Sequence, residues 1–404
     1  FNLGVALEAG GQLEEAAASW ERALRLQPNL AEARAKLGPA CIQLGEVLWA
    51  QGRLEQALTM CRRAIELQPQ SAQAQVNLGN VLQAMGRLQD AEGSYRLALA
   101  ADPNFAIAHA NLGTILKALG RLDEARESCE TAVALDPGFA EAHTNLGAVL
   151  QDQGHVEAAI AHYRRAVELN PKGPEAYSNL GGALESAGSL TEAEACCRRA
   201  IELKPGWAEP RFNLAVTLLL RGDFEAGLKE HEARWGCATF GRRPDLQGPA
   251  WSGEDPSGKS VLLYPEQGLG DVIQFARFGP LVRARGARVI IGAPPELTAL
   301  LRESGLADDV FGPAEPFRYD LHAPLMSVPY LTGATLDTLP PAPYLRVDPA
   351  RVPQWQARLG LAREFRVGIA WAGSPTNKTN RRRSMALAAL APLGSVPGVR
   401  LFSL

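Results

Sequence analysis

Small and apolar residues recur along the first half of the chain with a fixed period. Leucine–glycine pairs follow one another at a constant interval, and an alanine lies twelve residues after each glycine. Each unit closes with a proline. The glycines are Gly79, Gly113, Gly147 and Gly181, and the prolines are Pro103, Pro137, Pro171 and Pro205. A period of about 34 residues predicts a stack of helical hairpins, each formed by a helix A and a helix B.

The residue types explain how such hairpins pack. Glycine and alanine let helices A and B approach closely, and the proline cannot continue helix B, so it ends the unit. One hairpin alone cannot bury its apolar face, and stacking supplies the core. The pattern resembles the tetratricopeptide family, which implies a protein-binding superhelix.

The ends of the array depart from the regular unit. The first unit keeps Gly4, Trp20 and Pro28, and the next closing proline, Pro69, comes seven residues later than the period requires. Seven residues are about two helical turns, so we expect a longer helix A with the same buried face. Pro39 should kink or break that helix. We predict about seven units over residues 1–241.

Asparagine recurs two residues before the glycine position, on helix A. The residues are Asn2, Asn77, Asn111, Asn145, Asn179 and Asn213. An amide both donates and accepts, so a row of them can bind an extended peptide backbone without reading its sequence. The row resembles the asparagine ladder of the O-linked N-acetylglucosamine transferase superhelix. The alternative is that each amide bonds only locally.

After Trp235 the helical period ends, and residues 242–258 form a Gly/Pro-rich linker. An apolar run at 259–264 predicts a buried parallel strand. Further strands are expected at 287–291, 309–311 and 319–322, with helices at 272–285 and 296–304. This alternation predicts a doubly wound parallel sheet, so the fold class is an all-α superhelix followed by a Rossmann-like α/β region.

The first strand leads into a glycine-rich junction that contains Glu266, Gln267, Gly268, Gly270 and Asp271. Such a junction puts backbone N–H groups and a carboxylate at the carboxyl edge of the sheet, where ligands bind in open α/β folds. The alternative is a tight turn in which Asp271 caps the next helix.

A second α/β unit is predicted from a strand at 366–371, a helix that ends near Leu393 and a strand at 399–404. The loop after the first of these strands carries Lys378, Arg381, Arg382, Arg383 and Ser384. A cation cluster between strand and helix favours binding of a ligand's phosphates. Solvated charge on a loop is the alternative.

Three segments together resemble bacterial proteins that join tetratricopeptide repeats to a heptosyltransferase-like glycosyltransferase domain. They are EQGLGDVIQFARF at 266–278, DLHAPLMSVP at 320–329, and GIAWAGSPTNK with RRRS at 368–384. The resemblance implies a GT-B fold, with a first half at 259–349 and an incomplete second half at 350–404. Asn380 and the Tyr264-Pro265 pair depart from the family pattern.

The same resemblance implies the roles of the site residues. Asp271 would be the general base of an inverting transfer, and Glu266, Gln267, Gly268 and Gly270 would form the acceptor loop. Lys378, Arg381, Arg383 and Ser384 would bind the phosphates of the nucleotide-sugar donor. GT-B enzymes of this type need neither a metal nor a cofactor.

The charge and the cysteine content restrict the class of partner and the location of the protein. The net charge of −3 comes from interspersed acidic and basic residues, which disfavours nucleic acid as a partner. The six cysteines form no C-x-x-C pair, and Cys61, Cys129 and Cys197 recur at every second unit as packing residues. We therefore expect a reducing, cytoplasmic location. No apolar run approaches the ~20 residues that span a bilayer.

These features predict a glycosyltransferase whose repeats bind a protein acceptor. The rival is a tetratricopeptide scaffold with a non-catalytic α/β domain. A heptose transferase acting on lipopolysaccharide would need no peptide-binding repeats. Because the chain starts within a repeat and stops at a predicted strand, we interpret it as a fragment, which we expect to transfer no sugar by itself.

Overall fold

The computed structural model describes residues 1–312, 317–359, 365–369, 387–394, 396–397 and 399–403. The chain divides into two compact units. The first comprises Phe1–Leu246 with Gly333–Asp337, and the second comprises Gln247–Thr332 with Thr338–Leu404. Each unit is described here by itself.

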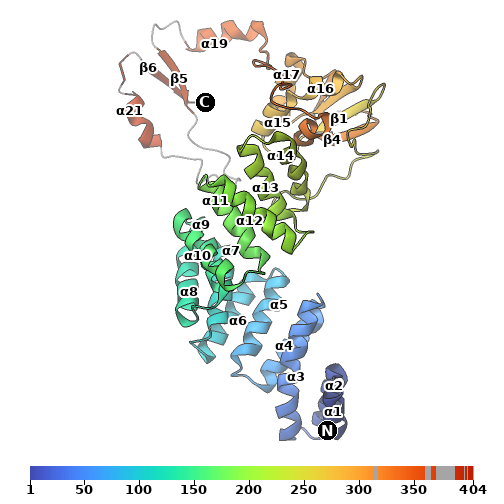
Figure 1. Cartoon of the computed structure of the whole chain (residues 1–404), viewed down its shortest axis with the longest axis vertical. Coiled ribbons are helices and arrows are strands. Elements are labelled where there is room, and N and C mark those ends of the chain that lie inside the picture. Colours follow the sequence, from blue (N-terminus) through green and yellow to red (C-terminus); the bar gives the residue numbers. More distant parts are fainter. Residues whose placement is uncertain (313–316, 360–364, 370–386, 395, 398, 404) are drawn as a thin grey trace. The chain divides into compact units, whose positions relative to one another are not determined.

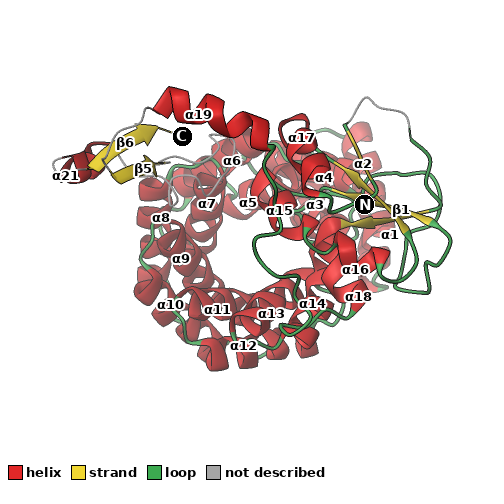
Figure 2. Ribbon diagram, turned by 90° about the horizontal axis from the view of Figure 1, so that it is seen from above, coloured by secondary structure: helices red, strands yellow, loops and turns green. Residues whose placement is uncertain are grey.

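The first unit is a stack of helical hairpins that ends in a short 3₁₀ helix (Figure 1). The odd-numbered helices are helix A of each hairpin, and Figure 2 shows α5 to α13 of this set on the inner side of the curve, with the even-numbered helices outside. The helices are α1 (Asn2–Ala9), α2 (Leu13–Leu26), α3 (Ala31–Ala50), α4 (Leu54–Leu67), α5 (Ala72–Ala84), α6 (Leu88–Ala101), α7 (Ala106–Ala118), α8 (Leu122–Leu135), α9 (Ala140–Asp152), α10 (Val156–Leu169), α11 (Pro174–Ser186), α12 (Leu190–Leu203), α13 (Ala208–Leu220), α14 (Phe224–His231) and η1 (Glu232–Gly236).

Within each hairpin the glycine of helix A faces one side chain of helix B, sixteen residues later. A Cβ on Gly113 would lie 2.2 Å from the sulfur of Cys129, and one on Gly79 would lie 2.5 Å from the ring of Tyr95. The facing residue alternates between a ring and a cysteine along the array. In order these residues are Trp20, Cys61, Tyr95, Cys129, Tyr163 and Cys197, and His231 lies at the same position of the last hairpin.

A second set of glycines closes the turn between helix A and helix B. From Gly52 to Gly222 they recur once in every hairpin, with φ between 74° and 90°. A side chain disfavours this left-handed conformation, so glycine is needed where the chain reverses. Gly86 is representative: its N–H donates to the carbonyl of Gln83 at 2.9 Å.

The helix α3 has 20 residues, whereas α5 has 13, so it is two turns longer. It runs through Pro39, which removes one intrahelical hydrogen bond without ending the helix. The Leu–Gly pair occurs twice, seven residues apart, so Gly38 and Gly45 lie on the same face. Gly38 is close to Gln68, and Gly45 to Cys61.

The second unit contains a four-stranded parallel sheet with strand order β3-β2-β1-β4. Val261 pairs with Val289 of β2 and with Leu321 of β4, and Ile290 pairs with Asp309 of β3. The central strands are apolar and buried. The elements are β1 (Ser260–Tyr264), α15 (Leu269–Ala276), α16 (Gly279–Arg283), β2 (Arg288–Gly292), α17 (Pro295–Ser304), β3 (Asp309–Phe311), β4 (Leu321–Pro324), η2 (Leu325–Ser327) and α18 (Val328–Thr332).

Two details of this sheet differ from the sequence prediction. The single helix expected at 272–285 is divided into α15 and α16, because Pro280, in the first turn of α16, has no N–H to continue the hydrogen bonds of α15. Gly279 beside it lies against the backbone of Leu306. The fourth strand begins two residues later than expected, at Leu321. Asp320, just before it, accepts hydrogen bonds from the N–H and the hydroxyl of Ser260 at 2.8 and 2.7 Å, which joins the starts of β1 and β4.

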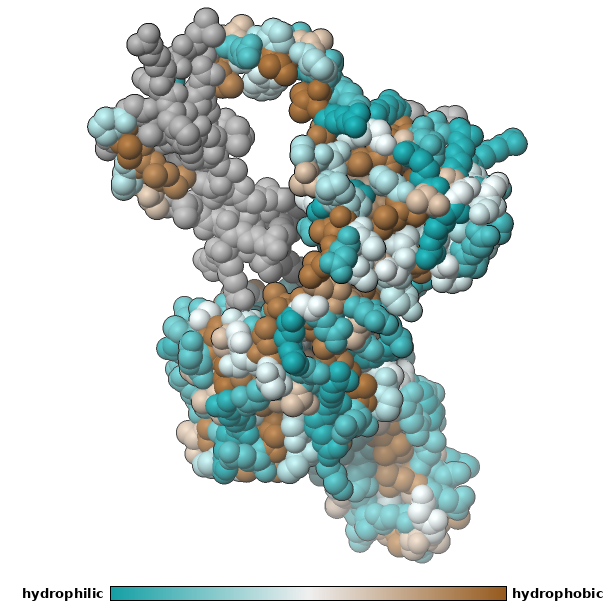
Figure 3. Space-filling model, turned by 45° about the horizontal axis from the view of Figure 1, so that its top comes forward, coloured by the Kyte–Doolittle hydropathy of each residue, from teal (hydrophilic) through white to brown (hydrophobic). Residues whose placement is uncertain are grey.

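The remaining described elements are η3 (Pro349–Arg351), α19 (Val352–Leu359), η4 (Leu387–Leu390), α21 (Ala391–Gly394) and a parallel pair formed by β5 (Phe365–Ile369) and β6 (Val399–Ser403). A GT-B arrangement of two facing halves stays a prediction. Among the described helices, none has both the length and the apolar content to cross a bilayer. On the face drawn in Figure 3, hydrophilic side chains cover much of the repeat helices, with smaller apolar areas between them.

Candidate functional site

The predicted ladder residues lie on the A helices of the array, which line its inner side (Figure 2). Asn77 is on α5, Asn111 on α7, Asn145 on α9, Asn179 on α11 and Asn213 on α13. Asn77 is buried and the other four are half-buried. The row therefore has the register that the repeat predicts. Its role in peptide binding stays a prediction.

The amide groups of this row have different partners. The Nδ2 groups of Asn77, Asn145 and Asn213 each donate at 3.3 Å to a backbone carbonyl on the preceding A helix; the acceptors are Ile42, Ala110 and Ser178. These three amides join neighbouring hairpins. Local bonding is thus part of their role, and it reaches across hairpins; the side-chain oxygen of Asn77 also accepts from Gln73 along α5 at 2.8 Å.

Asn111 and Asn179 do not make this bond in the described part of the chain. The amide of Asn111 donates instead to the side-chain oxygen of Asn80 at 2.9 Å, which also accepts from the hydroxyl of Tyr95 at 2.7 Å. The row is therefore not uniform, although its sequence context is.

Two cavities lie along the same helix A face. The first, about 340 Å³, is lined by α3, α5 and Ile107 of α7. Glu46 in this cavity accepts hydrogen bonds from the amides of Gln73 and Asn77 at 3.2 and 2.9 Å. The second, about 380 Å³, lies between α9, the end of α10 and α11, and is lined by residues that include Glu141, Thr144, Asn145 and Glu175.

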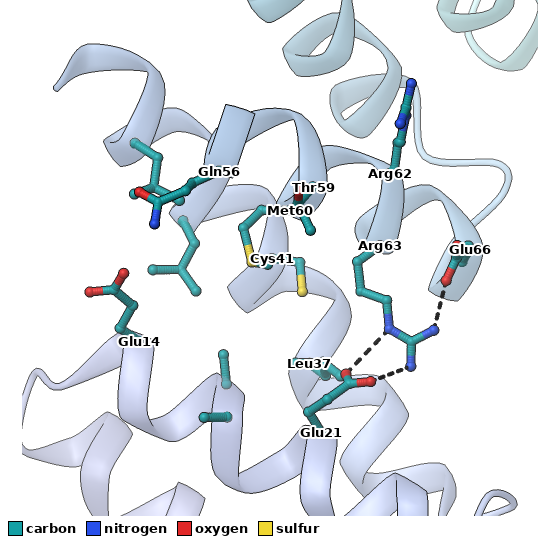
Figure 4. A pocket seen from close by; sticks show the side chains of 14 residues that line it. Glu14, Glu21, Leu37, Cys41, Gln56, Thr59, Met60, Arg62, Arg63 and Glu66 are labelled. Carbon is teal, nitrogen blue, oxygen red and sulfur yellow. Dashed lines mark hydrogen bonds and ion pairs between the residues drawn. The ribbon is translucent and has the colours of Figure 1, made fainter. Parts of the chain in front are cut away.

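A further cavity of about 600 Å³ lies between α2 and α4, over the long helix α3 (Figure 4). Its floor is apolar, with Leu37, Cys41 and Leu44 at helical spacing, and its rim is charged. Arg63 bridges Glu21 and Glu66, at 3.0 and 2.7 Å. Burial raises the pKa of the Cys41 thiol to about 11, which disfavours the thiolate form.

Sequence reasoning missed this third cavity. The signal was the doubled Leu–Gly pair at Leu37-Gly38 and Leu44-Gly45, which lengthens α3. The apolar positions were recognisable, but which helices would border them depends on the packing of α2 and α4.

The predicted acceptor loop lies at the carboxyl edge of the parallel sheet, directly after β1. Glu266 accepts a hydrogen bond from the N–H of Met326 at 3.1 Å, which connects this loop to the turn after β4. Gln267, Gly268 and Gly270 are exposed, and Asp271 is half-buried in the first turn of α15. Gly268, and not Asp271, is the N-cap of this helix, and no side chain caps it.

The predicted donor residues Lys378, Arg381, Arg383 and Ser384, together with Arg382 and Asn380, lie outside the described residues. Phosphate binding there stays a prediction. In the described part of the chain, no three His, Cys, Asp or Glu side chains are grouped so that they could hold a metal ion.

Comparison with known proteins identifies the repeats. Models described as tetratricopeptide repeats match residues 4–45, 38–104, 76–140, 144–206 and 208–228. This part of the chain therefore belongs to the tetratricopeptide-repeat family. The resemblance predicted from the repeat period is confirmed for the array, whereas a glycosyltransferase domain stays a prediction.

Individual relatives are distant. Protein FlbA of Caulobacter vibrioides is 28% identical over 211 residues, which cover 47% of this chain and 35% of that protein. The chain thus spans about a third of this curated relative. A tetratricopeptide protein of Thermus thermophilus, TTC0263, is 27% identical over 45% of this chain and 99% of its own, with a TM-score of 0.41. PilF of Pseudomonas aeruginosa is 23% identical over 52% of this chain and 95% of its own, with a TM-score of 0.45.

Proposed function

We propose that the repeat array binds an extended segment of a partner protein along its helix A face. The observation that carries this proposal is the row of buried and half-buried asparagines next to two cavities on that face. Asparagine amides can pair with a peptide backbone of any sequence, and the cavities can take side chains. Tetratricopeptide proteins bind protein or peptide partners, which supports the same role.

The test uses peptides selected from a random library on the whole chain. Asn111, Asn145 and Asn179 are then replaced together by alanine, and fluorescence anisotropy measures the affinity of the selected peptides. We expect a loss of about tenfold or more, because several backbone hydrogen bonds disappear. Asn104→Ala, in an exposed turn after α6, is the matched control. Unchanged affinity in the triple variant, or a library that yields no binder, would refute the proposal.

As a second function we propose that the α/β unit takes part in sugar transfer to the bound protein. Three features of the acceptor loop support this: it follows a buried parallel strand, Glu266 is anchored by the N–H of Met326, and the Asp271 carboxylate lies in the first turn of α15. In this proposal Asp271 accepts the proton of the attacking hydroxyl, and the loop cations at 378–383 bind the leaving diphosphate.

Asp271→Asn in the protein expressed from its own gene tests this second function. The variant should lose transfer from radiolabelled nucleotide-sugars and keep its fold, because only the proton acceptor is removed. Gln274→Ala, an exposed position one turn further along α15, is the control. Full transfer by Asp271→Asn would exclude the general base, and no transfer by the wild type with any donor would favour the scaffold.

A further inference from the structure

The array has a second period of two hairpins, which the single-hairpin period conceals. Hairpins with a ring at the glycine-facing position, such as Tyr95, alternate with hairpins that carry a cysteine there, such as Cys129. The asparagine hydrogen bonds to a backbone carbonyl of the preceding A helix follow the same alternation, because the donors Asn77, Asn145 and Asn213 all belong to ring hairpins.

Helix packing agrees with this division. Of the successive A helices from α3 onward, α3 with α5, α7 with α9 and α11 with α13 are the more closely packed pairs. At these junctions an asparagine donates to a backbone carbonyl of the preceding A helix, whereas at α5–α7 Asn111 donates to the side chain of Asn80. At α5–α7 and α9–α11 the A helices pack less closely. The second cavity lies at α9–α11, whereas the first lies mainly between α3 and α5 and reaches α7 only at Ile107.

The two cavities share part of their lining when the array is shifted by two hairpins. Four lining positions of the first recur in the second: Gln73 corresponds to Glu141, Val76 to Thr144, Asn77 to Asn145 and Ile107 to Glu175. The bridging asparagine is therefore the same in both, whereas the residues around it differ in chemistry.

The first cavity has large apolar side chains where it opens, and its one carboxylate, Glu46, accepts hydrogen bonds from the amides of Gln73 and Asn77. Trp49 and Ile107 line it with 42% and 41% of their surface exposed, although large apolar side chains are usually buried. The neighbouring amides of Asn77 and Asn80 offer hydrogen bonds beside this apolar surface. An apolar side chain on an extended backbone matches both features.

The second cavity is acidic. Glu141 forms no ion pair in the described part of the chain, and Glu175 has one exposed contact, with Lys204 at 3.7 Å. Burial, and next the charge of Glu175, raise the pKa of Glu141. A cation placed between these two carboxylates would relieve their repulsion.

We propose that the two cavities bind one extended peptide. A large apolar side chain of this peptide occupies the first cavity, and a lysine or arginine side chain occupies the second. The proposal rests on peptide binding by the array, described above, and adds the sequence class of the partner. The carboxylates of Glu141 and Glu175 favour a cationic side chain in the second cavity. The exposed side chains of Trp49 and Ile107 favour an apolar side chain in the first.

The shared lining positions allow a swap experiment. The probes are labelled peptides of alternating Gly and Ser that carry one Leu and one Lys, in both orders and with their separation varied residue by residue. The protein is the whole chain, as wild type and as the exchange variant Ile107→Glu with Glu175→Ile. Circular dichroism melts establish that both are folded.

The wild type should prefer one order of Leu and Lys by about tenfold, and the exchange variant should prefer the opposite order. Replacement of Lys by Glu in the peptide should weaken binding to the wild type, and added salt should reduce this difference. If both proteins bind both orders equally, the proposal is wrong, while peptide binding by the array stands. If no probe and no library peptide binds, peptide binding itself fails.

Discussion

In the repeat array, six buried glycines of the A helices each meet a side chain sixteen residues away, as Gly113 meets Cys129. In the parallel-sheet unit, Gly279 meets the backbone of Leu306, and Val261 of β1 pairs with Leu321 of β4, although β2 and β3 lie between them along the chain. The array therefore gains its stability from contacts within and between neighbouring hairpins, whereas the sheet needs several distant segments at once. A destabilising substitution should therefore affect only neighbouring hairpins in the array, but all four strands in the sheet.

The largest effect is expected for Gly113→Ala in the array. The new Cβ would lie 2.2 Å from the Cys129 sulfur and 3.1 Å from the Ala125 carbonyl, so α7 and α8 must separate. We expect a loss of about 3 kcal/mol in the free energy of unfolding, measured by urea denaturation.

Gly93→Ala in α6 is the matched control, because nothing lies within 4 Å of its Cβ position. This change should stabilise the chain by about 0.5 kcal/mol, since alanine favours a helix. Equal denaturation midpoints for Gly113→Ala and Gly93→Ala would contradict the role of the close glycine contact.

Gly279→Ala tests the sheet unit. Its Cβ would lie 2.4 Å from the Leu306 carbonyl oxygen, which is backbone and cannot rotate away. We expect a loss of about 2.5 kcal/mol. Hydrogen exchange should show lower protection in all four strands β1 to β4 but unchanged protection in α5 to α8. Loss of protection confined to α16 would show that the sheet is less cooperative than its distant pairings suggest.

The end of the array should respond to pH. Burial, and next the charge of Arg234, lower the pKa of His231 to about 4, below its ordinary value of 6.5. The unfolded chain therefore binds more protons between these values, and stability falls as pH falls from 6.5 to 4. The expected loss is about 2 kcal/mol at pH 5 relative to pH 8.

Urea denaturation across this range measures the His231 effect. His231→Gln should remove most of the slope of the unfolding free energy against pH. Replacement of Glu232, whose charge raises the pKa of His231, should change this slope little. The pKa of His162 is also lowered, first by burial and then by His143, so a smaller slope should remain. An unchanged slope in His231→Gln would assign the effect to other groups.

The smallest effect is expected for Asp320→Asn at the start of β4. Hydrogen bonds from the N–H and the hydroxyl of Ser260 lower the pKa of this exposed carboxyl. The stabilisation is present above the carboxyl's unfolded pKa and is lost as pH falls through its folded pKa. The variant should have a slightly lower denaturation midpoint at pH 7, and the two proteins should converge in acid. A constant difference at every pH would point to lost packing instead.

Several features were readable from the residues alone. The period of the Leu–Gly pairs predicted the hairpins, since glycine, alanine and proline each act through their own backbone and size. The seven-residue extension was equally readable, because seven residues are about two helical turns and return the apolar positions to the same face. The close approach of Leu306 to Gly279 was not, because Leu306 reaches this glycine only in the folded sheet.

For the asparagine row, too, some features follow from the sequence and others only from the tertiary structure. The period determined that Asn77, Asn111, Asn145, Asn179 and Asn213 share one position of helix A. Only the tertiary structure decided that three of them donate to a backbone carbonyl of the preceding hairpin, that Asn111 donates to Asn80 instead, and that Asn77 and Asn145 line cavities. Hydrogen-bond partners and cavity walls come from helices that adjoin only after the hairpins stack.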